Sequence, residues 1–452
     1  MLPPSPPRVQ TDQAQNVTGS DGLERGAPGD GHRSFTAIFR LNGFRLLWAS
    51  QLAGALGEAV AQVALPLFVY QLSGSARLLG LFFVLQTLPR VILAPVAGLL
   101  ADRLDRRRLM LTADIGRALT VAVLPFVDTV WPVAVLAALV AVGNAIARPA
   151  ELAAVPMLAG PRLLVSALAL IQVSNSLIRV VGPALGAGIV AMAGPAPAFW
   201  VQMVCFIASA SLVWRLVLPA SEPRATTIAA DGSVAAALRT ELLAGLRVVW
   251  INRIVRGITA AEVLWQVVGT VFIIGLVVYT EETIVLGERA GTVFALLTAT
   301  FSAGAAAGAI AGGCLESRIG RRRLLAIGYL APLFLLPVGL VPPLPMLFGC
   351  WFALGFLDAW AVIAMQAYLA EAVPDALRGR MYAAWSAVLT LAGAVWYGLV
   401  GWVIPVLGAP RVFVLAGLIV GIGGPLALLL TGALATLRHD AVAPRHVSAS
   451  GS

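Results

Sequence analysis

The stretch GLLADRLDRRR at residues 98–108 decides how this chain folds, because it returns as GCLESRIGRRR at residues 313–323. Aligned from Gly98 and Gly313, both copies start with a glycine, follow a long apolar run and end in three arginines. Two copies of one polar segment at corresponding places in a chain indicate an internal duplication. Parallel sets of helices related in this way are a known architecture of membrane proteins.

The composition places most of the chain in lipid. Hydrophobic residues make up 59% of the 452 residues and charged residues only 12%, whereas soluble domains carry about 25% charge. A bilayer core about 30 Å thick requires roughly 20 apolar residues per helix. Such stretches predict spans at 44–71, 77–101, 108–129, 132–157, 163–193, 197–218, 255–280, 290–313, 323–342, 346–372, 381–405 and 411–436. We expect an all-α membrane protein with twelve transmembrane helices in two pseudo-symmetric six-helix bundles.

Polar segments divide the chain into five parts. Residues 1–34, rich in Pro, Gly, Asp, Gln and Ser, predict a disordered tail, and residues 438–452 a second, shorter one. The longest internal break, 219–254, separates a bundle at 35–218 from one at 255–437. Leucines at helical spacing after Val234 predict an amphipathic helix on the inner membrane surface, although a solvated linker helix would show the same pattern.

The arginines orient the spans. All basic residues are arginine, and 24 of the 31 fall in tails and loops on one side of the predicted spans. Three, Arg77, Arg289 and Arg411, fall on the other side. Because cytoplasmic loops carry the excess of basic residues, both termini are expected in the cytoplasm, with the chain in the inner membrane. The basic pI then reflects topology, so we expect no nucleic-acid partner.

Metal, cofactor and nucleotide chemistry find no support in the sequence. The three cysteines lie in apolar stretches without CxxC spacing, and the three histidines lie in the polar tails. No GxxxxGK[ST] phosphate-binding loop occurs. We therefore expect no metal and no cofactor.

The repeated segment resembles the loop motif of the major facilitator superfamily, G-x-L-a-D-r-x-G-r-k. The first copy departs by Asp105 where Gly is usual, and the second by Ser317 where the acidic residue would stand. The resemblance implies that Asp102 caps a helix of the opposite half and that Arg106 pairs with Glu151, mainly in the first copy. The gate residues it implies are Gly98, Asp102, Arg103, Arg106, Glu151, Gly313, Arg318, Gly320 and Arg321.

A second motif lies in the fifth predicted span. Gly182-Pro183-Ala-Leu-Gly186-Ala187 is similar to the G-P-x-x-G-G signature of proton-coupled drug exporters, with Ala187 replacing the second glycine. Gly and Pro together permit close helix contact and a local bend. A packing kink without a transport role explains the same residues.

Four further stretches resemble the enterobactin and macrolide exporter branch of this superfamily. They are ALPLFVYQLSGS at 64–75, residues 101–110, Asp114-x-x-Arg117 and residues 373–380. The resemblance extends over roughly residues 40 to 436.

Ionisable residues inside spans are candidates for function, since each costs roughly 2.5–3.5 kcal/mol on insertion scales. The candidates for proton coupling and the substrate cavity are Glu58, Arg90, Arg179, Glu262 and Asp358. Glu58 and Asp358 lead, because burial favours the protonated form of a carboxyl group. A permanent Glu58–Arg90 ion pair is the alternative. For Asp114, Arg117, Arg148 and Glu151 we favour a structural or gate role. Unspecific candidates for the pathway are Gln62, Gln86, Gln172, Gln266, Gln366, Trp265, Phe301, Trp360 and Trp385.

The sequence thus predicts a monomeric, proton-coupled secondary exporter of a small amphipathic molecule such as a drug, antibiotic or siderophore. It would work by alternating access, with protons and the lipid bilayer as its other partners. An importer or a lipid-moving member of the same fold is the first alternative. An intramembrane enzyme would need a clustered nucleophile and base or a metal site, and a scaffold or sensor would need an output domain.

Overall fold

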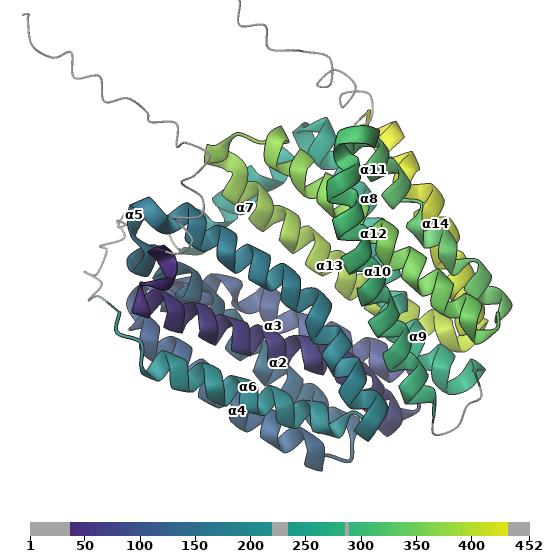
Figure 1. Cartoon of the computed structure of the whole chain (residues 1–452), viewed down its shortest axis with the longest axis horizontal. Coiled ribbons are helices and arrows are strands. Elements are labelled where there is room, and N and C mark those ends of the chain that lie inside the picture. The colour runs from purple at the N-terminus through teal and green to yellow at the C-terminus, as the bar shows by residue number, and fades with distance from the viewer. Residues whose placement is uncertain (1–36, 219–233, 285–288, 433–452) are drawn as a thin grey trace, which may run out of the picture.

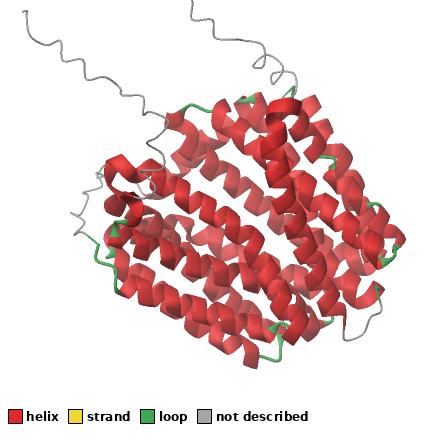
Figure 2. Cartoon of the chain, in the orientation of Figure 1, coloured by secondary structure: helices red, strands yellow, loops and turns green. Residues whose placement is uncertain are grey.

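The computed structural model describes residues 37–218, 234–284 and 289–432, with the side chains of 90, 91, 94–103, 234–242, 317, 375 and 376 left out. Within these ranges the regular structure is entirely helical (Figure 2). The α-helices are α2 (Asn42–Ser73), α3 (Ala76–Arg103), α4 (Arg106–Val123), α5 (Val130–Ala193), α6 (Ala196–Trp214), α7 (Val234–Ile251), α8 (Arg253–Thr270), α9 (Leu276–Val278), α10 (Ala290–Ile319), α11 (Arg321–Gly328), α12 (Leu344–Ala372), α13 (Asp375–Leu407) and α14 (Ala409–Leu430).

Ten helical segments of the described residues are long and apolar enough to cross a bilayer, and Ala76–Pro89 of α3 forms a shorter apolar helix. The chain is therefore a multi-pass membrane protein. Helix α5 has 64 residues, about 96 Å at 1.5 Å per residue, and this is roughly three times the thickness of a bilayer core. It is interrupted at Gly160, whose φ of 65° is a left-handed conformation that glycine tolerates best. The interruption lies between the predicted spans 132–157 and 163–193.

Two predicted helices change their winding along their length. The span predicted at 323–342 is α-helical only to Gly328 and continues as 3₁₀ segments at Ala331–Leu335 and Pro337–Leu340. Prolines 332 and 337 explain the change, because a proline has no N–H for an α-helical hydrogen bond. The span predicted at 255–280 passes from α8 into π-helical segments at Val271–Gly275 and Tyr279–Thr283.

The helices form two groups that follow the order of the chain. Figure 1 shows α2 to α6 gathered on one side and α8 to α14 on the other. The groups meet where α5 packs against α10 and α3 packs against α13. The linker helix expected after Val234 is α7, and its Gly245 lies against the backbone of Arg380 on α13.

Glycines set the closest approaches between helices. A Cβ placed on Gly182 would lie 2.3 Å from Cβ of Ala59, and one on Gly186 would lie 2.5 Å from the carbonyl oxygen of Val60. Helix α5 therefore presses directly on the backbone of α2 through the predicted Gly-Pro motif. Helices α10 and α12 meet in the same way, with Gly308 against the carbonyl oxygen of Phe356. Small residues of this kind permit the close packing that replaces hydrophobic attraction in lipid.

A buried polar network joins four helices of the first group. Asp114 and Arg117 of α4 form an ion pair and are only 2% and 5% exposed. Ser209 of α6 donates to Asp114 Oδ2 at 2.7 Å, and Arg117 donates to Asn144 of α5. Arg117 also pairs with Glu58 of α2, with Nη1 and Oε1 3.4 Å apart. One guanidinium thus ties α4 to both α2 and α5.

We predict that Gly186→Ala destabilises the protein by about 1–3 kcal/mol, because the added methyl group meets rigid backbone of α2. The measurement is a denaturant titration of the purified protein in mixed micelles. The matched control is Gly188→Ala, since a Cβ at that exposed position has no atom within 4 Å. Equal stability of the two variants would contradict the close contact between α5 and α2.

We further predict that Arg117→Gln costs about 3–5 kcal/mol, because it leaves the buried Asp114 carboxylate without its counter-charge. The double variant Asp114→Asn with Arg117→Gln should unfold at higher denaturant than Arg117→Gln alone. Arg148→Gln is the control, since Arg148 is 57% exposed and its ion pair with Glu151 spans 3.6 Å. If Arg117→Gln and Arg148→Gln unfolded at the same denaturant concentration, the ion pair between Asp114 and Arg117 would be energetically unimportant.

Candidate functional site

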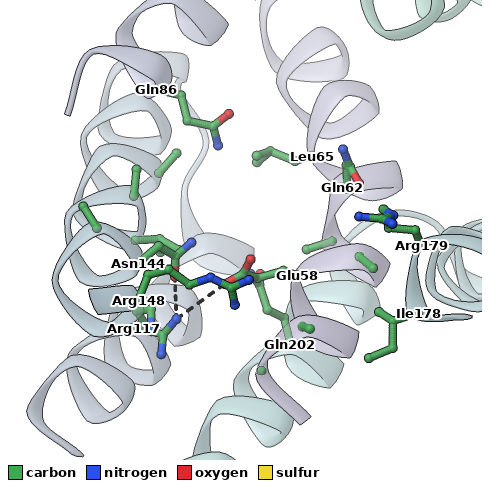
Figure 3. A pocket seen from close by; sticks show the side chains of 18 of the residues that line it. Glu58, Gln62, Leu65, Gln86, Arg117, Asn144, Arg148, Ile178, Arg179 and Gln202 are labelled. Atoms are coloured by element: carbon green, nitrogen blue, oxygen red, sulfur yellow. Dashed lines mark hydrogen bonds and ion pairs between the residues drawn. The ribbon is translucent and has the colours of Figure 1, made fainter. Parts of the chain in front are cut away.

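A cavity of about 1010 Å³ lies between the two groups of helices (Figure 3). Its walls come mainly from α2 and α5, with α3, α4 and α6 contributing, and from α8 and α13 of the second group. This volume is at the upper end of the roughly 300–1,000 Å³ typical of small-molecule sites. The polar residues that line it include Glu58, Gln62, Gln86, Arg117, Asn144, Arg148, Glu151, Gln172, Asn175, Arg179, Gln202 and Gln266.

One end of the cavity is sealed by contacts between the two groups. On α2 the lining runs from Ser50 to Pro66, and the next residue, Leu67, lies against Gly291 of α10. One turn further, Tyr70 donates a hydrogen bond to Glu282 of the second group.

Helices α3 and α13 close the same end. A Cβ on Gly80 would lie 2.6 Å from the carbonyl oxygen of Tyr397 and 3.0 Å from Cα of Gly401. Phe83, one turn along α3, already lines the cavity. The lining therefore stops where the two backbones touch.

Among the described side chains, five charged residues line the cavity, and four of them form ion pairs. Glu58, whose side chain is 40% exposed, pairs with Arg117 at 3.4 Å, and Arg148 pairs with Glu151 at 3.6 Å. The fifth, Arg179, donates to the Ser176 hydroxyl at 3.0 Å. Figure 3 shows Glu58, Arg117 and Asn144 joined through the guanidinium, with Arg179 across the cavity.

Two of the expected cavity residues, Glu58 and Arg179, do line the cavity. The carboxylate of Glu58 pairs with Arg117. The side chain of Arg90 lies outside the described part of the chain, so the alternative of a Glu58–Arg90 ion pair stays a prediction. Arg117, Arg148 and Glu151, expected to serve structure or the gate, also line the cavity. Spacing of three places charged residues on one face of a helix, but it does not say whether that face meets the cavity.

Glu262 and Asp358, expected in the cavity, are not among its lining residues. Glu262 of α8 accepts a hydrogen bond of 2.6 Å from the buried Tyr329 hydroxyl, and Trp265 packs edge-on against the Tyr329 ring. Asp358 of α12 interacts electrostatically with Glu262. Both residues are half-buried, and Glu262 is engaged by Tyr329 of the same group of helices.

The unspecific candidates divide in the same way. Gln62, Gln86, Gln172 and Gln266 line the cavity, whereas Gln366, Trp265, Phe301, Trp360 and Trp385 do not. Asn144, Gln202, Thr390 and Tyr397 line it and were not predicted. Their one signal in the sequence is a polar group within an apolar span, which many helix contacts share.

The first copy of the repeated segment departs from the expected pairing. Arg106 contacts the sulfur of Met157, and Glu151 pairs with Arg148, so the structure does not bring Arg106 and Glu151 together. Asp105, the departure from the motif, caps α4 by accepting from the backbone N–H of Arg108 at 2.8 Å. The side chains of Asp102 and Arg103, and any Cβ contact at Gly98, lie outside the described part.

The second copy makes the kind of pair expected of the first. Arg321 donates to Glu371 of α12 at 2.6 Å and to Glu316 of α10 at 2.7 Å. Gly320 has a φ of 82° between α10 and α11, which explains the glycine. Gly313 and Arg318 are exposed. Sequence reasoning missed Glu316 and Glu371 as partners of Arg321.

Comparisons with known proteins agree with this architecture. Residues 33–443 match the family described as transmembrane secretion effector. Macrolide efflux protein A of Streptococcus pyogenes is 30% identical over 32% of this chain and 37% of its own length. The multidrug efflux pump Tap of Mycolicibacterium fortuitum is 25% identical over 79% of this chain and 87% of its own length. The chain spans less than half the length of the curated relatives it matches at about 30% identity.

Solved structures show the same fold. The nucleoside transporter NupG superposes with a TM-score of 0.65 at 12% identity, over 86% of this chain and 98% of its own. With the family match over most of the residues, the chain belongs to the transmembrane secretion effector family of the major facilitator superfamily.

Proposed function

We propose that this transporter is a proton-driven exporter of small amphipathic molecules that works as a monomer in the inner membrane. The observation that carries the proposal is a drug-sized cavity between two helix groups, lined by ionisable side chains and sealed at one end. Such a cavity is one end state of alternating access, in which two halves rock about a central site. Opening the seal and closing the other end would present the same residues to the opposite side.

Twelve spans in two halves fit the structure under this proposal. The interruption at Gly160 divides α5 into two parts of about 30 residues, each long enough to cross the bilayer. Helix α3 supplies one further span. The two copies of the repeated segment then lie at the same membrane face, as the arginine bias of the loops requires.

Glu58 is our candidate for the coupling carboxyl group. It is the carboxylate of the buried network that reaches the cavity, and it shares Arg117 with Asp114. The contact of Arg117 with Glu58 is the longer of the two, since it spans 3.4 Å, and the side chain of Glu58 is 40% exposed whereas that of Asp114 is buried. A proton arriving from the cavity would neutralise Glu58 without breaking the pair between Asp114 and Arg117.

The substrate class rests on relatives. Proteins named for macrolide efflux and multidrug efflux match this chain, and the cavity combines amide and guanidinium groups with apolar walls such as Leu65, Phe83 and Ile273. This mixture suits molecules with an apolar body and a few polar groups.

We predict that reporter fusions place the residues after Arg106 and after Arg321 in the cytoplasm. Fusions after Arg77 and Arg411, in the loops predicted on the other side, are the matched controls and should report from the periplasm. The measurement compares a reporter active only in the cytoplasm with one active only outside it. Arg106 and Arg321 on opposite faces would refute the arrangement of two parallel halves.

We predict that Glu58→Gln lowers accumulation driven by a pH gradient at least tenfold in everted vesicles, because the amide cannot carry a proton. Substrate exchange without a gradient should persist. The assay uses labelled erythromycin, ethidium and 8-anilinonaphthalene-1-sulfonate, so that cationic and anionic cargo are both sampled. Asp128→Asn, which changes an exposed loop carboxylate, is the control. Asp358→Asn tests the other leading carboxyl group, and full activity of both Glu58 and Asp358 variants would remove them as couplers. Accumulation in right-side-out vesicles alone would indicate an importer.

A further inference from the structure

Arg179 stands apart from the other charged groups of the cavity. Arg117 is held by Asp114 and Glu58, and Arg148 by Glu151. Across the described residues, the contact of the Arg179 guanidinium is one hydrogen bond to the neutral hydroxyl of Ser176. Most of its N–H groups therefore remain open to the cavity, which Arg179 lines as an exposed residue.

The position of Arg179 is fixed by the packing of its helix. Gly182, one turn further along α5, lies against Ala59 of α2, so the Arg179 turn is held beside the part of α2 that carries Glu58 and Gln62. Figure 3 shows the guanidinium pointing into the cavity next to Gln62. A charge at this depth is costly without a partner or water, and the protein does not provide a carboxylate for it among its described residues.

From this geometry we propose that the cargo carries an anionic group, a carboxylate, sulfonate or phosphate, and that Arg179 binds it. The inference rests on the proposed transport function and specifies its substrate. A guanidinium presents paired N–H donors that match these oxyanions bidentately. The amide of Gln62 lies beside it as a further donor, and the apolar body of the cargo then faces Leu65, Ile178 and Phe83.

The test measures binding to the purified full-length protein in detergent by equilibrium dialysis. Its probes are 8-anilinonaphthalene-1-sulfonate and N-phenyl-1-naphthylamine, which share one aromatic body and differ by the sulfonate. Wild-type protein should bind the sulfonate at least tenfold more tightly than the neutral amine. Arg179→Gln should remove that preference while leaving affinity for the neutral amine within twofold, which shows that the cavity is intact.

Two further variants sharpen the comparison. Arg179→Lys keeps the charge and loses the paired donors, so it should retain part of the preference. Arg162→Gln removes an exposed arginine of the same helix that does not line the cavity, and it should keep the full preference. An unchanged preference in Arg179→Gln, or tighter binding of cationic ethidium than of the sulfonate by wild-type protein, would overturn the inference.

A further comparison, made with labelled lipids, distinguishes the two possible sources of the anionic group. Fluorescently labelled phosphatidylglycerol, compared with phosphatidylcholine, should show the same dependence on Arg179 if the group belongs to a lipid headgroup, whereas a preference confined to the soluble sulfonate assigns it to a free small molecule. Because binding is measured without a gradient, the inference and the export function fail independently. Intact binding preference with no transport in vesicles would reject export and leave the anion site standing.

Discussion

A buried ion pair inside the apolar helices is the constraint on which the first group of helices depends. Asp114 and Arg117 are almost fully enclosed, and neither charge is tolerable there without the other. Because Arg117 also reaches Asn144 and Glu58, the pair fixes the relative rotation of α4, α5 and α2. The cavity lies beside this network, and Glu58 is a carboxylate of the network that also lines the cavity.

Close contacts at glycines also hold the helices in place. Gly182 and Gly186 bring α5 against the backbone of α2, and Gly80 brings α3 against α13 at the sealed end of the cavity. The contacts of Gly182 and Gly186 lie within one group of helices and position Arg179, whereas the contact of Gly80 joins the two groups. Contacts of the second kind must separate if the cavity is to open on the other side, and backbone touching backbone through glycine carries no side-chain interdigitation to undo.

The two copies of the repeated segment make different side-chain contacts. The first copy was expected to carry the latch, yet in this conformation Arg106 lies on Met157 and Glu151 belongs to the cavity. The second copy, with serine in the acidic position, ties α11 to α12 and α10 through Arg321, Glu371 and Glu316. Duplication in sequence therefore does not ensure identical contacts, since partners on other helices decide which pairs form.

The sequence by itself determined the all-helical membrane architecture, and it placed Glu58 and Arg179, both of which line the cavity, among the functional candidates. These follow from apolar length, arginine bias and the cost of charge in lipid, which are local properties of the chain. Only the tertiary structure decided that Arg117, Arg148 and Glu151 line the cavity whereas Glu262 and Asp358 do not. The sequence of a span that is apolar on all sides does not indicate which side faces the cavity. The rotation of such a helix is set by its packing against helices that are far away in the chain.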